Sequence, residues 1–181
     1  MHTDAGNDEL SSNARNSNMV KLAEYIKGVS EGKAVIIFGD TNSLYIYKLD
    51  NFYDLVIKPC NLEDAWIEDV MESKIPEKGK SLKPEKLGQK GEVLDKIWYR
   101  SGKNIKIEAT WFKILLNEFT DQNGKELSEH YPIPSIIKYE LIDGILTSDI
   151  FERKKIKGKG FSFIEKMDDN YPVSVDHLFN W

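Results

Sequence analysis

The chain has 181 residues, a formal net charge of −5 and a sequence pI of about 5.3. Hydrophobic residues make up 40% and charged residues 30%, which allows a packed core and excludes a disordered or collagen-like chain. The acidic balance argues against broad binding to a nucleic-acid backbone, and the single cysteine, Cys60, excludes an internal disulfide framework. Neither a signal peptide nor an apolar run of the ~20 residues that span a membrane is seen, so the sequence predicts a soluble chain. Its localisation stays open and is cytoplasmic only if the sequence is taken literally.

The first third of the chain predicts a helix followed by a strand. Residues 1–13 are polar and predict a loop. Apolar residues then recur at the spacing of one helix face, which predicts a helix from Ala14 to Gly28 with Arg15 off that face. The apolar residues of this face are Met19, Leu22, Ala23 and Ile26. The apolar run Ala34–Phe38 predicts a strand that is buried on both faces, which favours layers of helix on sheet.

The middle of the chain predicts two helical pieces and a long loop. Residues 51–57 and 62–71 have helical spacing, with Trp66 in the second piece. Residues 72–91 are rich in Lys, Glu, Gly and Pro and predict an exposed loop. The tryptophans Trp66, Trp98 and Trp111 are interpreted as core residues rather than a binding platform.

Three alternating segments then predict a sheet. Glu92–Arg100 and Ile105–Trp111 alternate with period two and flank a turn, so they predict an antiparallel hairpin. Asn123-Gly124 marks a further turn. Ile133–Ile142 predicts a buried strand that closes the same sheet.

Polar residues follow the first predicted strand directly, as Gly39-Asp40-Thr41-Asn42. The carboxyl end of a core strand is where layered proteins of helix and sheet place their sites. Asp40 can bind a metal or take a proton, and Asn42 can donate its amide to a charged oxygen. The alternative is an ordinary turn, because Gly, Asp and Asn are common turn residues.

Asp95 lies on the same strand face as Val93, Ile97 and Tyr99, so its carboxylate points toward apolar surroundings and requires a partner. One interpretation is a structural salt bridge to a lysine. The other is a carboxylate that orients a histidine, because such a pair fixes the imidazole tautomer and stabilises the imidazolium.

Two further motifs carry histidine beside an acid. Ser128-Glu129-His130 precedes the last predicted strand and could bind a metal and a phosphate oxygen together, although a surface turn explains it equally well. His2-Thr3-Asp4 lies at the N-terminus, where fraying is the alternative.

In chain order, the segments His2–Asp4, Val35–Asn42, Val93–Ile97 and Ser128–Pro132 resemble the endonuclease/exonuclease/phosphatase superfamily, to which deoxyribonuclease I belongs. The most similar motifs known to us are those of its fungal extracellular-type branch. The resemblance covers residues 1–142 and implies an α/β (α+β) chain that forms the C-terminal half of a deoxyribonuclease I-like domain. That half would be one half of a four-layer β-sandwich flanked by helices.

The resemblance implies a role for each matched residue. Asp40 would bind or orient the attacking water, and Asn42 would hold a phosphate oxygen in the transition state. Asp95 would pair with His130, and His130 would contact the scissile phosphate. His2 would make another phosphate contact. Phosphodiester hydrolysis needs an in-line water, a cation and donors aimed at the phosphate oxygens.

The resemblance also implies a divalent ion. Glu129 matches a superfamily aspartate that helps to hold the ion, and Asp40 is the second expected ligand. Hard carboxylate oxygens suit Mg²⁺, with Mn²⁺ and Ca²⁺ as alternatives. Since Glu129 is longer than aspartate by one methylene, we expect weaker coordination of Mg²⁺, which demands near-ideal octahedral geometry.

The expected activity is therefore divalent-metal-dependent phosphoester hydrolysis, on a substrate that the sequence does not specify. The main metal-binding glutamate of the superfamily lies in an N-terminal half, and we expect this chain to lack that half. The first alternative is accordingly a truncated, non-catalytic remnant that acts at most as a binding module. The second is a plain α/β domain without a site. The exposed inner face of a half-sandwich would favour self-association.

Residues 143–181 differ from the rest of the chain. The basic stretch Arg153–Lys159 is interpreted as a solvated linker rather than a site for anions or membrane. The segment Lys157–Phe161 resembles the opening strand of jacalin-like lectins, which would make this region a linker and tail that contains the start of a truncated lectin module.

Overall fold

The computed structural model describes residues 1–142, so the expectations for the basic stretch and the lectin-like segment in 143–181 lie outside the described residues. In chain order the elements are α1 (Glu9–Val29), β1 (Val35–Asp40), η1 (Tyr53–Ile57), η2 (Lys58–Cys60), β2 (Glu63–Asp64), α2 (Ala65–Asp69), α3 (Pro84–Leu87), η3 (Gly88–Lys90), β3 (Asp95–Arg100), β4 (Ile105–Phe112) and β5 (Ser135–Leu141). This mixture of helices and strands is compatible with the predicted α+β class. A four-layer sandwich is not confirmed.

Helix α1 begins earlier than the sequence pattern predicts. Its N-cap is Asp8, whose carboxylate accepts a hydrogen bond from the backbone nitrogen of Ser11 at 2.9 Å. Because this cap satisfies the first free N–H groups, the helix starts at Glu9 rather than at Ala14. The predicted loop over residues 1–13 is therefore wrong from Glu9 onward, whereas the predicted apolar face is confirmed: Met19, Ala23 and Ile26 are buried.

Arg15 is buried, although the pattern places it off the apolar face of the helix. Its Nη2 lies 2.9 Å from Asp50 Oδ1, and both side chains are 1% exposed. The same guanidinium donates to the backbone oxygens of Asp4 and Gly6. A buried charge persists only with such partners. Arg15 thereby ties α1 to the N-terminal segment and to the loop after β1.

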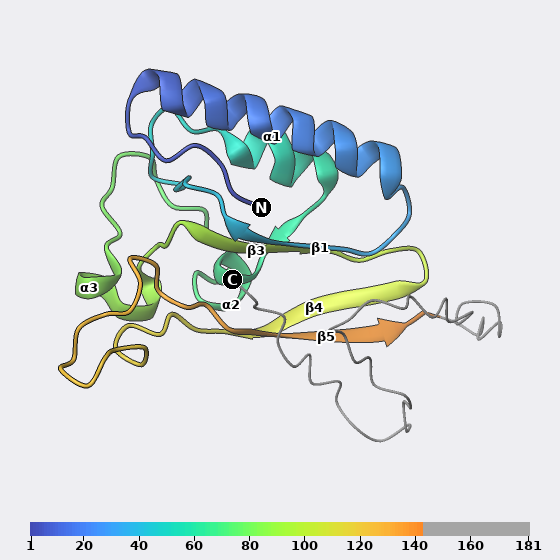
Figure 1. Ribbon diagram of the computed structural model, residues 1–181. Helices are drawn as coiled ribbons and strands as arrows, with labels where there is room; N and C mark the ends of the chain where they lie inside the picture. Colours follow the sequence, from blue (N-terminus) through green and yellow to red (C-terminus); the bar gives the residue numbers. More distant parts are fainter. Residues whose placement is uncertain (143–181) are drawn as a thin grey trace, which may run out of the picture. The chain divides into compact units, whose positions relative to one another are not determined.

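The strands form two antiparallel sheets, one in the order β1-β3-β2 and one of β4 and β5 (Figure 1). The predicted hairpin between β3 and β4 is therefore wrong. The two strands follow each other along the chain, but β1 and β2 already occupy both edges of β3, so β4 pairs with β5 in the second sheet. The last predicted strand, which is β5 in the structure, was expected to close the same sheet as β3. This prediction is wrong for the same reason, because β5 pairs with β4 in the second sheet.

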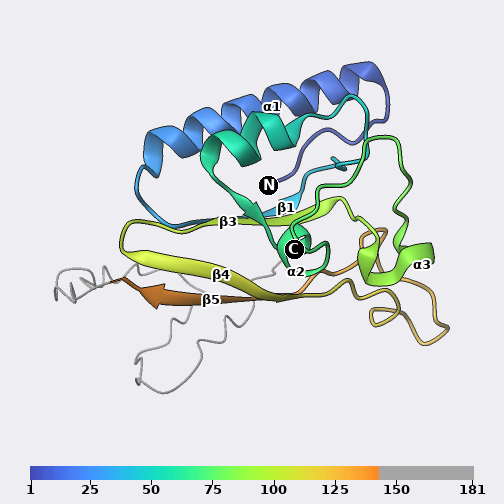
Figure 2. The same ribbon diagram turned by 180° about the vertical axis from the view of Figure 1, so that it is seen from behind.

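Helices α1 and η1 cover one face of the three-stranded sheet, whereas α2 and the β4–β5 sheet lie on its other side (Figures 1 and 2). At the helix side Trp98 of β3 stacks on Phe52, with ring centroids 5.6 Å apart. Trp98 and Trp66 are buried as predicted, whereas Trp111 at the end of β4 is 40% exposed.

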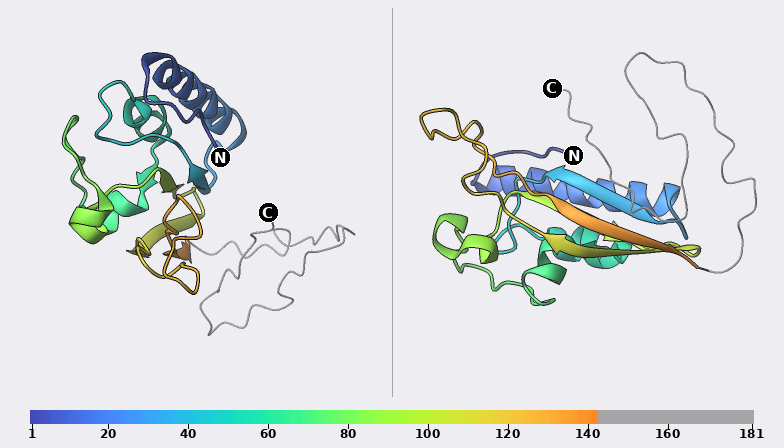
Figure 3. Two further views of the ribbon diagram at one scale, coloured as in Figure 1. Left: turned by 60° about the vertical axis from the view of Figure 1, so that its left-hand side comes forward. Right: turned by 90° about the horizontal axis from the view of Figure 1, so that it is seen from below.

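The strands β1 and β5 are less buried than the apolar pattern predicts. Ile36 and Phe38 of β1 are 48% and 60% exposed, and Leu141 of β5 is 54% exposed. Each of these strands is the edge of its sheet among the described residues, and Figure 3 shows this open side from below. An apolar run therefore does not by itself distinguish a central strand from an edge strand whose face lacks a cover.

The segment 72–91 contains α3 and η3 and is only in part the exposed loop that its composition predicts. Gln89 accepts a hydrogen bond from the indole of Trp66 through its backbone oxygen, and Pro84 is buried. Within the predicted helical piece 62–71, the first residues pair with β3 as β2 before α2 begins. None of the helices described in residues 1–142 is long and apolar enough to cross a membrane.

Candidate active site

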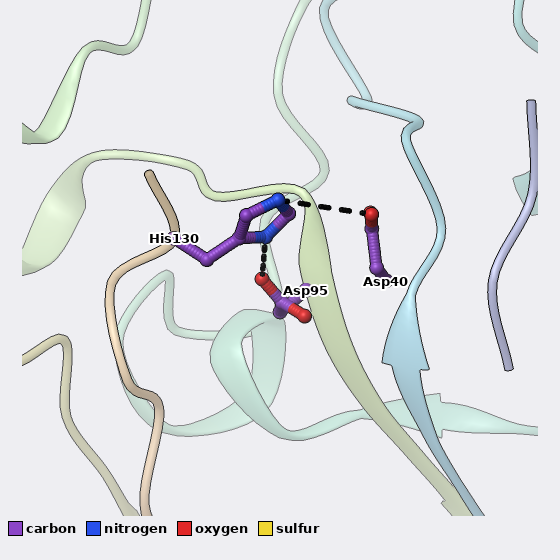
Figure 4. Close-up of side chains that lie close together, drawn as sticks. All are labelled: Asp40, Asp95 and His130. Carbon is purple, nitrogen blue, oxygen red and sulfur yellow. Dashed lines mark hydrogen bonds and ion pairs between the residues drawn. The ribbon is translucent and has the colours of Figure 1, made fainter. Parts of the chain in front are cut away.

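The pairing of β1 with β3 brings two acidic residues together. Asp40 is the last residue of β1 and lies directly opposite Asp95, the first residue of β3. The loop 128–132 then places His130 beside both carboxylates (Figure 4). One ligand atom from each of Asp40, Asp95 and His130 lies within 4.8 Å of the others.

His130 and Asp95 lie within hydrogen-bond distance, as the superfamily resemblance implies. Nδ1 of His130 is 2.6 Å from Oδ2 of Asp95, and Nε2 lies 3.8 Å from Oδ2 of Asp40. With Asp95 ionised, Nδ1–H donates to it, and Nε2 faces Asp40. The Asp95 carboxylate therefore selects which imidazole nitrogen faces the centre of the cluster.

The two carboxylates favour the charged form of the imidazole. The hydrogen bond to Asp95 raises the pKa of His130 above its ordinary value of 6.5, and the nearby charge of Asp40 adds to this effect. Burial of the imidazole acts in the opposite direction and is outweighed. The site can thus carry a positive imidazolium between two acids.

Asn42 lies against Asp40, and its amide is occupied by protein atoms. Nδ2 donates to Asp40 Oδ2 at 3.0 Å and to the backbone oxygen of Thr3 at 2.8 Å. The backbone nitrogen of Asn42 donates to Asp40 Oδ1 at 2.8 Å. In this structure Asn42 therefore holds the Asp40 carboxylate, and its role toward a phosphate oxygen stays a prediction.

The N-terminal segment pairs with the end of β1 and is not frayed. His2 forms a parallel bridge with Asp40, and its Nε2 lies 3.3 Å from Asp40 Oδ2. Gly39 has a φ of +140°, and a Cβ at this position would lie 2.3 Å from the backbone oxygen of Met1. Only glycine allows this approach. His2 consequently lies at the rim of the cluster, with a side chain that is 74% exposed.

Glu129 is exposed, and the structure groups Asp95 and His130 with Asp40 instead. The two carboxylates suit hard divalent ions such as Mg²⁺ and Mn²⁺, and His130 can join them as a ligand only in its neutral form, because an imidazolium has no lone pair to offer. The residues present therefore fit a divalent cation. Asp40 is a ligand both in this group and in the prediction made from the sequence. The pairing of Glu129 with Asp40 at a metal stays a prediction.

Sequence reasoning missed the two threonines that hold the site. The hydroxyl of Thr41 donates to the backbone oxygen of Leu94 at 2.7 Å, and the hydroxyl of Thr3 donates to the backbone oxygen of Thr41. Both threonines are buried. Each threonine is adjacent in the sequence to a predicted site residue. Because this occurs in both motifs, it is the feature of the sequence that could have identified the two threonines.

An α+β fold in which two paired strands bring two aspartates together and a loop adds a histidine is an arrangement suited to metal-assisted hydrolysis. Comparison with known proteins agrees with hydrolysis. Sphingomyelinases of Mycobacterium bovis and of two strains of Mycobacterium tuberculosis are each 32% identical to the chain over 137 residues, which is 73% of this chain. The chain spans about a quarter of the length of these relatives, since the matched part is 25% of each.

This similarity is in line with the resemblance of the motifs to the endonuclease/exonuclease/phosphatase superfamily. The relatives named are bacterial, so they do not support the fungal branch that the motifs suggest, nor do they identify the matched part as a C-terminal half. No family model matches the chain, and no solved structure matches it significantly.

The raised pKa of His130 can be measured by NMR titration of its Cε1 resonance in the presence of a chelator. We expect a value above 6.5 in the unchanged chain, and a larger fall in Asp95→Asn than in Glu129→Gln, because the hydrogen bond to Asp95 is the main cause. The stability from this pair is present below pH 6.5 and is lost as the pH rises through the raised, folded-state pKa. Equal titration in all three proteins would contradict the assignment.

Proposed function

We propose that the chain contributes the histidine–aspartate side of a divalent-metal-dependent phosphodiesterase site. The observation that carries this proposal is the convergence of Asp40, Asp95 and His130 from two paired strands and a loop. The similarity to sphingomyelinases supports phosphodiester hydrolysis as the chemistry. The alternative is a non-catalytic remnant that acts at most as a binding module.

The proposed roles follow from the contacts. Asp95 fixes the imidazole so that Nε2 of His130 faces the reaction centre, where its charge can stabilise a phosphate oxygen. Asp40, held by Asn42, is a ligand of the cation or an acceptor of the proton of the attacking water. A bound divalent ion would supply charge neutralisation. Water adds its oxygen to phosphorus, the ester oxygen leaves, and that oxygen takes up a proton.

Substitution within the cluster tests this proposal. We expect Asp40→Asn and His130→Gln each to lower turnover of bis-p-nitrophenyl phosphate with Mg²⁺ or Mn²⁺ by about 10²-fold or more, and a chelator to abolish it. Glu140→Gln, on the exposed face of β5, is the matched control and should retain activity. Absence of turnover in the unchanged chain with every cation would favour the remnant.

We propose a lipid rather than a nucleic acid as the source of the phosphodiester. Phe119 and Leu127 are 54% and 68% exposed and are joined by a backbone hydrogen bond of 3.1 Å. Together with His130 they line a pocket of about 100 Å³. Apolar side chains beside the site suit a substrate with apolar groups, and the net charge of −5 disfavours a polyanion. Sphingomyelin, a lipid phosphodiester, meets both conditions.

A double substitution separates lipid binding from chemistry. We expect Phe119→Ser with Leu127→Ser to lower turnover of sphingomyelin in vesicles by roughly tenfold or more, because apolar contact with the lipid is lost. Turnover of the water-soluble bis-p-nitrophenyl phosphate should change by less than about twofold. Equal losses on both substrates would argue against a lipid-contacting role of this pair.

We also propose that the open side of the two sheets favours self-association, because Ile36, Phe38 and Leu141 are exposed on edge strands. Sedimentation at increasing protein concentration measures this association. We expect Ile36→Ser with Phe38→Ser to shift the chain toward monomer, whereas Leu10→Ser, an exposed apolar position on α1, should not. A chain that is monomeric at all concentrations would contradict the proposal.

A further inference from the structure

A buried ion pair lies directly behind the candidate site. Nζ of Lys96 is 2.8 Å from Oε1 of Glu92, and the two side chains are 3% and 0% exposed. Nζ also donates to the backbone oxygen of Val93 at 2.6 Å. The ammonium lies 5.6 Å from the ring centre of Tyr45 and 5.8 Å from that of Trp66. The charge of Lys96 is therefore surrounded by a carboxylate, a carbonyl and two aromatic faces.

The same carboxylate joins the two segments that carry the site. Oε1 of Glu92 accepts a hydrogen bond from the backbone nitrogen of Tyr45 at 2.7 Å. Tyr45 follows Asn42 by three residues, and Glu92 precedes Asp95 by three residues. Lys96 is the strand neighbour of Asp95 and lies opposite Gly39 in the register of β1 and β3. Movement of Glu92 would thus change the path of both segments.

Stability alone does not account for this pair. Burial raises the pKa of Glu92, which means that its charged form is penalised inside the protein. Among the described residues, Oε2 of Glu92 is a buried side-chain oxygen without a hydrogen-bond partner. Apolar side chains of similar size often replace a buried ion pair without loss of stability. The distinctive contribution of Glu92 is an acceptor at a fixed place for the N–H of Tyr45.

We propose that Glu92, held by Lys96, is a positioning residue that fixes the loop 41–45 against the segment that precedes β3 and thereby sets the placement of Asn42, which holds the Asp40 carboxylate toward Asp95 and His130. The kinetic effect of this role rests on the proposed phosphodiesterase function, whereas the structural anchor does not. At its other end the loop is held separately, because the backbone nitrogen of Thr41 donates to the backbone oxygen of Leu94 at 3.1 Å.

Two matched double variants test the role. In Glu92→Gln with Lys96→Met, the amide oxygen can still accept from Tyr45. In Glu92→Leu with Lys96→Met, that acceptor is lost. Both variants lack Lys96, so the buried carboxylate of Asp64 loses the same nearby cation in each, and the comparison between the two variants stays matched. We expect the leucine variant to lose about tenfold or more in kcat, with KM within about twofold, because small misplacement of catalytic groups is costly. The glutamine variant should keep kcat within about threefold.

Amide hydrogen exchange gives a result that does not depend on activity. We expect the N–H of Tyr45 to exchange faster in the leucine variant than in the glutamine variant, while the N–H of Thr41 stays equally protected in both. If the unchanged chain lacks turnover, the proposed function fails, and the exchange of Tyr45 still decides whether Glu92 anchors the loop.

Equal kcat and equal Tyr45 exchange in the two variants would overturn the proposal, as would a tenfold loss of kcat in a glutamine variant that keeps Tyr45 protected.

If the leucine variant does not fold, Glu92→Asp replaces it. This variant keeps the charge beside Lys96 but withdraws the carboxylate by one methylene, so it should lose kcat and Tyr45 protection. Full kcat and full Tyr45 protection in Glu92→Asp would then reject the positioning role.

Discussion

The site depends on one cross-strand pair, Asp40 opposite Asp95 at the end of the β1–β3 ladder. Like charges directly opposite each other destabilise a sheet, so this pair persists only where something offsets the repulsion. His130 lies against both carboxylates and supplies that charge when it is protonated. A divalent cation would supply more of it. Repulsion between the two carboxylates therefore destabilises the fold at this position, and the same two carboxylates give the site its affinity for positive charge.

The surrounding structure limits how far these side chains can move. Asn42 and the N-terminal segment hold Asp40 from one side, and the loop beyond it is tied to the segment just before β3 through Thr41 and Glu92. Most of these ties involve backbone atoms of the segments that adjoin the two strands. Catalysis by charge placement requires such fixed groups, because their orientation is then established before the substrate arrives.

The sequence predicted best what depends on local pattern or on a motif. The apolar face of α1 follows from periodicity, and the proximity of Asp95 to His130 was implied by motif order. The partner of each strand was not predictable, because alternation in 105–111 is the same whether β4 pairs with β3 or with β5. Burial of Arg15 was equally hidden, since it depends on Asp50, which lies 35 residues away along the chain. Edge exposure of β1 also depends on which strands lie beside it.

The guanidinium of Arg15 has a consequence for the dynamics of the fold. It binds the Asp50 carboxylate together with the backbone oxygens of Asp4 and Gly6, so helix, loop and N-terminal segment share a single anchor. Opening of any one of them would expose the same charge, so we expect the three to open together rather than one at a time. The N-terminal segment that lies beside Asp40 is then expected to open with α1 and not as an independent surface loop.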